Sequence, residues 1–271
     1  MTWRPRHEAH AIERVRLLFT FREPVPSKVV AKSSHETREQ ASDLGFDAVG
    51  PAESSIQTIK LQAHSAPQTE PSSKNGFVMR RHQDGAVIEV VEEVGFRDMV
   101  YGYMTKTYGR WESLVTRLEE ALLPALDNIS DVAELDAIKL EYWDSFVFEG
   151  NPLEADVSKL LSVVDGAIPA NVCAGSSAWH SHVGWFEGDE EAPTLINRNI
   201  DVVDTSNGEG KDMRSLGIYT LVERRSKSAP LEFQSVRELI NGMHKRSLLL
   251  FGKSLSAEYR DQIGIDLEAY K

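Results

Sequence analysis

One stretch of this chain decides its fold class: residues 111–148, WESLVTRLEEALLPALDNISDVAELDAIKLEYWDSFVF. Its first part repeats apolar residues three and four positions apart, which predicts an amphipathic helix that ends near Pro124. Its last part, from Leu135 to Phe148, alternates in places and is rich in aromatic strand formers. A polar turn at residues 127–131 joins the two parts. A helix is therefore expected to pack on a sheet near the middle of the chain.

The sequence before this stretch predicts a strand, a helix and a group of further strands. The expected elements are a strand at 11–21, a helix from Pro26 to about residue 40, and strands at 59–63, 77–83, 86–94 and 95–108. Asp84-Gly85 separates two of these strands, and this dipeptide favours a tight hairpin turn.

The sequence after the stretch predicts a similar succession. The expected elements are a helix at 151–164, strands at 171–186, 193–203 and 216–224, and a helix at 231–253. Asn151 and Pro152 suit the N-cap and the first turn of the first of these helices. The last helix carries a continuous apolar face.

The order of strand, helix, three strands and helix thus occurs twice. We expect an α+β fold, a mostly antiparallel sheet with packed helices. The repeated order suggests two βαβββα halves, residues 1–130 and 131–271, which form either two intimately packed units or one domain.

Composition and charge narrow the classes of protein. A hydrophobic fraction of 41% and a charged fraction of 27% are those of a soluble globular protein. The formal net charge of −12 disfavours nucleic acid and suits a basic partner protein. The single cysteine, Cys173, excludes an internal disulfide and suits a reducing compartment. With no apolar run of about 20 residues and no signal peptide, we expect a cytoplasmic protein away from membranes.

No cofactor or metal is predicted, because each tempting motif fails in its context. Gly252-Lys253-Ser254 resembles the end of a phosphate-binding loop, but Ser247 occupies the position of the required earlier glycine. His180 and His182 share one face of a predicted strand and could chelate a metal, but a third ligand is missing nearby. Cys173 could be a nucleophile only with a histidine against it in space.

The most unusual local feature is Glu141-Tyr142-Trp143-Asp144 in the central strand. The two carboxylates are three residues apart, so they point to opposite faces and do not form an acid/base pair. They are expected to be solvent-facing charges at a sheet edge, or else part of a polar and aromatic recognition surface. The candidate binding residues are Tyr142, Trp143, Asp144, Trp179, His180, His182 and Trp185.

Several motifs recur in an order that can be compared with known families. They are the strand 11–21 followed by Pro24 and Pro26, the Asp84-Gly85 hairpin, Tyr108-x-x-Trp111, Ile138-x-Leu140-x-Tyr142, and the closing helix with His244, Phe251 and Leu255-Ser256. Over nearly the whole chain this order resembles an uncharacterised, sporadically distributed bacterial family of about 250 residues.

The resemblance implies no catalytic residues, since that family has no established activity. Its central strand is close to Arg-Tyr-Ile-Asn, where this chain has Glu141-Tyr142-Trp143-Asp144, and the exchange of Arg for Glu argues against a shared anionic ligand. Its patchy distribution is similar to that of mobile accessory genes, such as those of phage defence or toxin neutralisation.

Three functions follow as hypotheses. The first is a non-enzymatic module that binds another protein, as an accessory or neutralising subunit of a bacterial defence or toxin system. The second is a small-ligand sensor, whose two similar halves form an aromatic cleft lined by Trp143, Trp179, Trp185 and Tyr219. The third is an enzyme whose site is assembled from distant residues, with Cys173 or the histidine pair as nominees, so enzymatic activity stays an open question.

Overall fold

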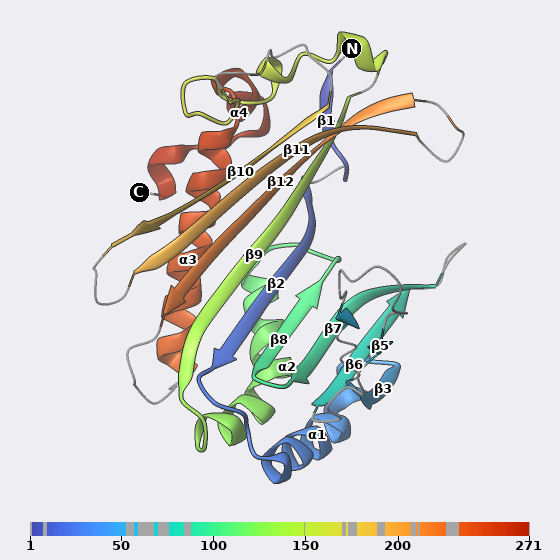
Figure 1. Cartoon of the computed structure of the whole chain (residues 1–271), viewed down its shortest axis with the longest axis vertical. Helices are drawn as coiled ribbons and strands as arrows, with labels where there is room; N and C mark the ends of the chain where they lie inside the picture. The colour runs from blue at the N-terminus through green and yellow to red at the C-terminus, as the bar shows by residue number, and fades with distance from the viewer. Residues whose placement is uncertain are drawn as a thin grey trace.

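The structure is a computed structural model that describes residues 2–7, 10–52, 57–58, 68–69, 76–83, 88–148, 150–169, 172, 178–188, 193–206, 210, 212–225 and 233–270. A ten-stranded sheet dominates these residues, and the long helices α2 and α3 lie behind it in Figure 1. The expected α+β class is therefore confirmed.

The bounds of the elements follow the chain in two groups. The strands are β1 (Trp3–Pro5), β2 (Ile12–Phe21), β3 (Ala48–Pro51), β4 (Gln57–Thr58), β5 (Gln68–Thr69), β6 (Gly76–Gln83), β7 (Glu89–Arg97), β8 (Val100–Thr105), β9 (Leu135–Phe148), β10 (Trp179–Glu187), β11 (Thr194–Ser206) and β12 (Asp212–Arg225). The α-helices are α1 (Ser27–Ala41), α2 (Trp111–Ser130), α3 (Phe233–Ser254) and α4 (Ala257–Ile263), and the 3₁₀ helices are η1 (Pro152–Glu154), η2 (Val157–Lys159) and η3 (Leu267–Tyr270).

The strand order relates the two halves of the chain. The sheet runs β10-β11-β12-β9-β2-β8-β7-β6-β3, and its described pairings are antiparallel. In each half the first strand pairs with the last of the three later strands: β2 with β8, and β9 with β12. β2 and β9 then pair with each other at the centre. The halves thus share one order of strands within one continuous sheet, and their division at residue 130 stays a prediction.

The main core lies between the sheet and the helices. Alternate residues of β2 (Val15, Leu17 and Phe19) and of β9 (Ile138 and Leu140) are buried on the helix-facing side. Helix α2 covers them with its buried stripe, which includes Leu118, Leu122, Ala125 and Ile129. Apolar residues repeat every two positions along the strands and about every 3.6 positions along the helix. This period places them on one face of each element, which explains why β2 and β9 form strands and α2 forms a helix.

Helix α2 continues past the expected end at Pro124, to Ser130. A proline inside a helix removes the hydrogen bond that its N–H would donate one turn back. Packing offsets this loss here, because Ala125, Leu126 and Ile129 after the proline remain buried in the core. Asn128 also donates from Nδ2 to the Pro124 carbonyl at 2.9 Å.

The helix expected at 151–164 is wrong, and two short 3₁₀ helices, η1 and η2, take its place. The Asn151 side chain accepts a hydrogen bond from Leu153 N, and the Asp156 side chain accepts one from Ser158 N. Each cap begins a new turn instead of extending the previous one. Leu161 then forms an isolated β-bridge with Leu255, which ends any helical path.

The other predicted helices and strands are confirmed in part. Strands at 11–21, 77–83, 193–203 and 216–224 and both remaining helices are confirmed within a few residues, and α4 was not predicted. The segment 95–108 divides between the end of β7 and β8, whereas β10 begins only at Trp179. The Asp84-Gly85 turn and the strand at 59–63 lie outside the described residues.

Among the described helices, none combines the length and the apolar character that crossing a membrane requires.

Candidate functional site

The central strand β9 sends its unusual residues to two different faces of the sheet. Tyr142 and Asp144 point toward α3, whereas Glu141 and Trp143 point to the opposite side, here called the open face. Only 4% of Glu141 and 5% of Asp144 is exposed. The expectation of solvent-facing charges at a sheet edge is therefore wrong, because β9 is an inner strand between β2 and β12.

The carboxylate of Glu141 is fully engaged on the open face. It forms a bidentate ion pair with Arg16 and accepts a hydrogen bond of 2.6 Å from the Tyr219 hydroxyl. Burial and this hydrogen bond raise the pKa of Tyr219. The Arg14 guanidinium lies 3.8 Å from the centre of the Trp143 ring, a cation–π contact. These contacts fix a polar and aromatic surface across β2, β9 and β12.

The residues nominated on β10 also divide between the faces. Trp179 and Trp185 pack against the helix-side cores, while His180 and His182 are exposed, with their ring centroids 5.4 Å apart. His182 Nε2 lies 3.9 Å from Asp201 Oδ1. Across the described residues, no group of three His, Cys, Asp or Glu side chains is placed to hold a metal. Cys173 lies outside that part of the chain.

These positions separate the four rings of the expected aromatic cleft. Trp143 and Tyr219 contact each other on the open face, with centroids 5.0 Å apart. Trp179 and Trp185 lie on the other side of the sheet, in different cores. The four rings therefore do not line one cleft, since the sheet stands between the two pairs.

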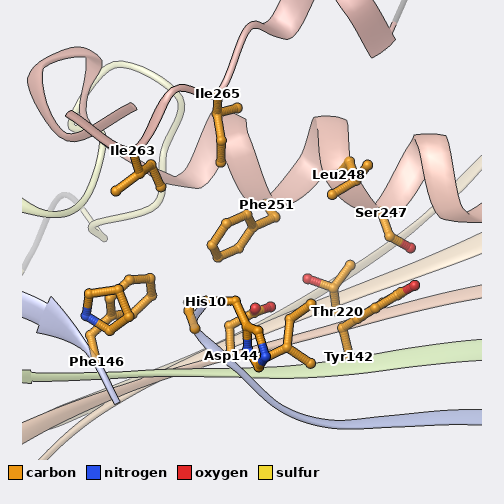
Figure 2. Close-up of a pocket in the computed structure, with 13 residues that line it drawn as sticks. His10, Tyr142, Asp144, Phe146, Thr220, Ser247, Leu248, Phe251, Ile263 and Ile265 are labelled. Atoms are coloured by element: carbon orange, nitrogen blue, oxygen red, sulfur yellow. The ribbon is translucent and has the colours of Figure 1, made fainter. Parts of the chain in front are cut away.

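A cavity of about 450 Å³ lies on the helix-facing side, next to Tyr142 and Asp144. We call it the α3 cavity, and it is lined by Pro5, His10, Ala11, Ile12, Tyr142, Asp144, Phe146, Thr220, Ser247, Leu248, Phe251, Ile263 and Ile265. Figure 2 shows the side chains of β9 and β12 on one side and those of α3 opposite them. Ile263 and Ile265, at the end of α4 and just after it, close another wall.

Three polar groups of the α3 cavity have no partner among the residues that the structure describes. The Thr220 hydroxyl and His10 Nδ1 are buried with no hydrogen bond within the described residues. The carboxyl of Asp144, a residue that is 5% exposed, has no hydrogen bond or ion pair in that part of the chain either. Burial, with a smaller contribution from the charge of Glu13, raises the pKa of Asp144 to about 8.

The neighbouring polar groups are satisfied and hold the cavity wall in place. The Tyr142 hydroxyl and His244 Nδ1 are hydrogen bonded at 2.8 Å. The Trp111 ring stacks on His244 with centroids 4.0 Å apart, and Trp111 Nε1 donates to Asn241 Oδ1 at 2.7 Å. Burial lowers the pKa of His244 to about 4, so its ring is neutral near pH 7. Ser247 donates to the Met243 carbonyl at 3.0 Å.

Sequence reasoning named Tyr142 and Asp144 but missed His10, Thr220 and the isoleucines. The alternation of the strands does contain a signal for Asp144 and Thr220. Asp144 interrupts the series Tyr142, Phe146 on β9, and Thr220 interrupts the series Ile218, Val222 on β12. A polar residue at a core position of a strand is a reason to suspect a site.

The chain was compared with known families and structures. No family model and no curated protein matches it, which is consistent with an uncharacterised family. One similar solved structure is that of an uncharacterized protein from Mycobacterium tuberculosis, at 10% identity, with 89% of this chain and 72% of that chain covered. Its TM-score of 0.16 is too low to carry an argument about fold or function.

Proposed function

We propose that this protein binds a small ligand in the α3 cavity and acts as a small-molecule sensor or carrier. The observation that carries the proposal is that one cavity holds the Thr220 hydroxyl and His10 Nδ1, both buried without a partner among the described residues, together with the Asp144 carboxyl. Each such group costs about 1–3 kcal/mol when it is left unsatisfied. A bound molecule that supplied the missing hydrogen bonds would remove this cost.

The size and lining of the cavity agree with this role. A volume of about 450 Å³ lies within the usual range for small-molecule sites, roughly 300–1,000 Å³. Phe146, Leu248, Phe251, Ile263 and Ile265 give it apolar walls. A few converging polar groups in an apolar pocket are typical of sites that orient a ligand.

An uncharged fluorescent probe, N-phenyl-1-naphthylamine, tests the proposal directly. We expect its emission to rise when it enters the cavity of the wild type. The variant Leu248→Trp should abolish the rise because the larger ring fills the cavity. Leu249→Trp is the matched control, since Leu249 is the next residue of α3 and does not line the cavity. Equal probe emission from both variants, or none from the wild type, would contradict the proposal.

A second candidate function is the binding of another protein on the open face. No described helix packs over Trp143 and Tyr219, and Phe186 on β10, which β11 separates from β12, is 64% exposed. Aromatic rings of this kind are favoured where protein partners anchor. The roles in defence or toxin neutralisation, a bacterial origin and a cytoplasmic location stay predictions of this second candidate.

The native mass of the protein tests the second candidate. Purified from its source cells at low salt, the wild type should form a heavier assembly that dissociates at high salt, because the net charge of −12 favours a basic partner. Phe186→Ser should weaken the assembly. A monomer at both salt concentrations would argue against this function and leave the α3 cavity as the site.

A further inference from the structure

We infer that the ligand of the α3 cavity is an organic amine, whose ammonium group pairs with the Asp144 carboxylate and whose apolar body lies against Phe251, Ile263 and Ile265. The inference rests on the proposed ligand-binding function and names the chemical class of the ligand. It follows from the kinds of hydrogen-bonding groups in the cavity, from their charge and from the walls around them.

The unpartnered groups of the cavity are mainly acceptors. His10 Nε2 lies 2.9 Å from the Tyr108 carbonyl oxygen, which can only accept, so Nε2 carries the hydrogen in this contact. Nδ1 of the neutral ring is then an acceptor, and it is buried without a partner in the described residues. The Asp144 carboxylate offers further acceptor sites, and the Thr220 hydroxyl can accept as well. An ammonium group, with its several N–H donors, matches this set.

No protein cation neutralises Asp144 in the part of the chain described. Among the described residues, the cavity lining includes neither lysine nor arginine. The titratable groups around Asp144 are Glu13 of β2, His10 before that strand, Tyr142 of β9, Tyr108 after β8, and His244 of α3 behind Tyr142. Arg198 of β11 is bound instead to the Ser254 hydroxyl and the Gly166 carbonyl. A positive charge to pair with an ionised Asp144 would therefore have to come from the ligand.

An amine would also stabilise the ionised state of Asp144 in this site. A buried carboxylate is costly unless a charge of opposite sign stands beside it. An acidic ligand would lie near the negative charge of Glu13 and would keep Asp144 protonated, so it would gain no ion pair there. A neutral ligand could bond to the protonated acid, and the test below separates this case from an amine.

The experiment compares three molecules with the same apolar body, 4-phenylbutylamine, 4-phenylbutanol and 4-phenylbutanoate, as competitors of N-phenyl-1-naphthylamine. We expect the amine to displace the probe from the wild type at roughly tenfold lower concentration than the alcohol or the acid. Asp144→Asn should remove this preference, because the variant has no carboxylate to pair with the ammonium group, while the alcohol should still displace the probe. Glu13→Gln, which changes a carboxylate outside the cavity lining, is the matched control and should keep the preference.

A second measurement needs no variant. With a pKa of about 8, Asp144 is protonated at pH 7 and must lose its proton to pair with an ammonium group. Calorimetric titration of the wild type in two buffers of different ionisation enthalpy should therefore show release of about one proton per amine bound. Amine binding without proton release would overturn the inference.

The outcomes separate the two claims. If the probe binds but the amine is no better than the alcohol, the amine inference fails and ligand binding stands. If Asp144→Asn keeps the preference for the amine, the inference also fails. If the probe does not bind the wild type, the proposed function itself fails.

Discussion

Two polar residues, Asp144 and Thr220, lie where the alternation of their strands calls for apolar side chains. Residues directly across the sheet from them, Ile218 and Tyr142, belong to the helix-facing layer. Sequences normally avoid such conflicts, which lower the stability of the fold. Their coincidence at a single cavity is best explained by a function that requires them.

The pH dependence of stability reports the state of Asp144. Its folded pKa of about 8 lies above the unfolded value of about 3.9. Its contribution is therefore fully present below about pH 4 and is lost as the pH rises through 8, by up to about 1.4 kcal/mol per pH unit. Asp144→Asn should flatten this decline in denaturant titrations from pH 4 to 9. Parallel pH profiles for the two proteins would contradict the prediction, and Thr220→Val should keep the slope of the wild type.

Glu92 shows the opposite case, a buried carboxylate that is fully paired. Its side chain is 2% exposed and accepts hydrogen bonds from Arg81, Arg117 and Tyr103, at 2.7, 2.6 and 2.6 Å. Burial alone would raise the pKa of Glu92, but these hydrogen bonds lower it overall. Its contribution to stability is therefore present at neutral pH and is lost as the pH falls below about 4.

Glu92→Gln should lower the free energy of unfolding by about 3 kcal/mol at pH 7, because it removes the buried charge that pairs with the half-buried Arg81 and Arg117. The difference from the wild type should shrink in acid. Glu93→Gln on the same strand is the control, since Glu93 pairs with Arg80 and Arg97 at a more exposed position. It should cost less than about 1 kcal/mol. Similar losses for both variants in urea titrations would refute this account.

At the scale of elements, β8 reaches the centre of the sheet through a close approach at Gly102. A Cβ atom at this position would lie 2.4 Å from Leu18 Cδ2 and 2.8 Å from the Leu17 carbonyl oxygen. The carbonyl belongs to the backbone of β2 and cannot move without disturbing the ladder between the strands. Glycine is thus required here for space.

Gly102→Ala should lower the free energy of unfolding by about 1–3 kcal/mol through this overpacking. Gly217→Ala on β12 is the matched control in a neighbouring part of the sheet, because within the described residues only one atom lies near the position of its Cβ, at 4.0 Å. Thermal or urea unfolding of both variants measures the difference. An equal effect at the two positions would show that steric contact is not the cause.

At the scale of the whole molecule, β9 joins the halves. Leu140 lies opposite Leu17 of β2 on one side and Val222 of β12 on the other, and it is fully buried. One hydrophobic core contains residues of both halves, from Phe19 and Leu118 to Val222 and Ile240. A core shared in this way couples the stability of the two halves.

We therefore expect the chain to unfold in one cooperative transition. Circular dichroism and native-state hydrogen exchange should give β8 and β12 the same free energy of opening. Leu140→Ala should lower both values together, by about 2–5 kcal/mol, since it leaves a cavity at the joint. Separate transitions for the halves, or a loss confined to one of them, would show two independent domains.

The sequence by itself determined the elements whose apolar pattern is long and regular. The alternation of β2 and β9 and the stripes of α2 and α3 were enough, because burial of one face imposes a fixed period. Prediction from the sequence failed where local caps or packing decide where a helix begins and ends, as in η1, η2 and the end of α2 beyond Pro124.

Only the tertiary structure decided which side of the sheet each candidate faces and what it meets there. Sequence placed Asp144 in a recognition surface with Trp143, whereas the fold puts these neighbours on opposite sides of the sheet. His10, Asp144, Thr220 and Ile265 are far apart along the chain and meet because β2, β9, β12 and the segment after α4 converge. The physical reason is that local periodicity fixes a residue's face relative to its own element, while a cavity depends on contacts between elements distant in sequence.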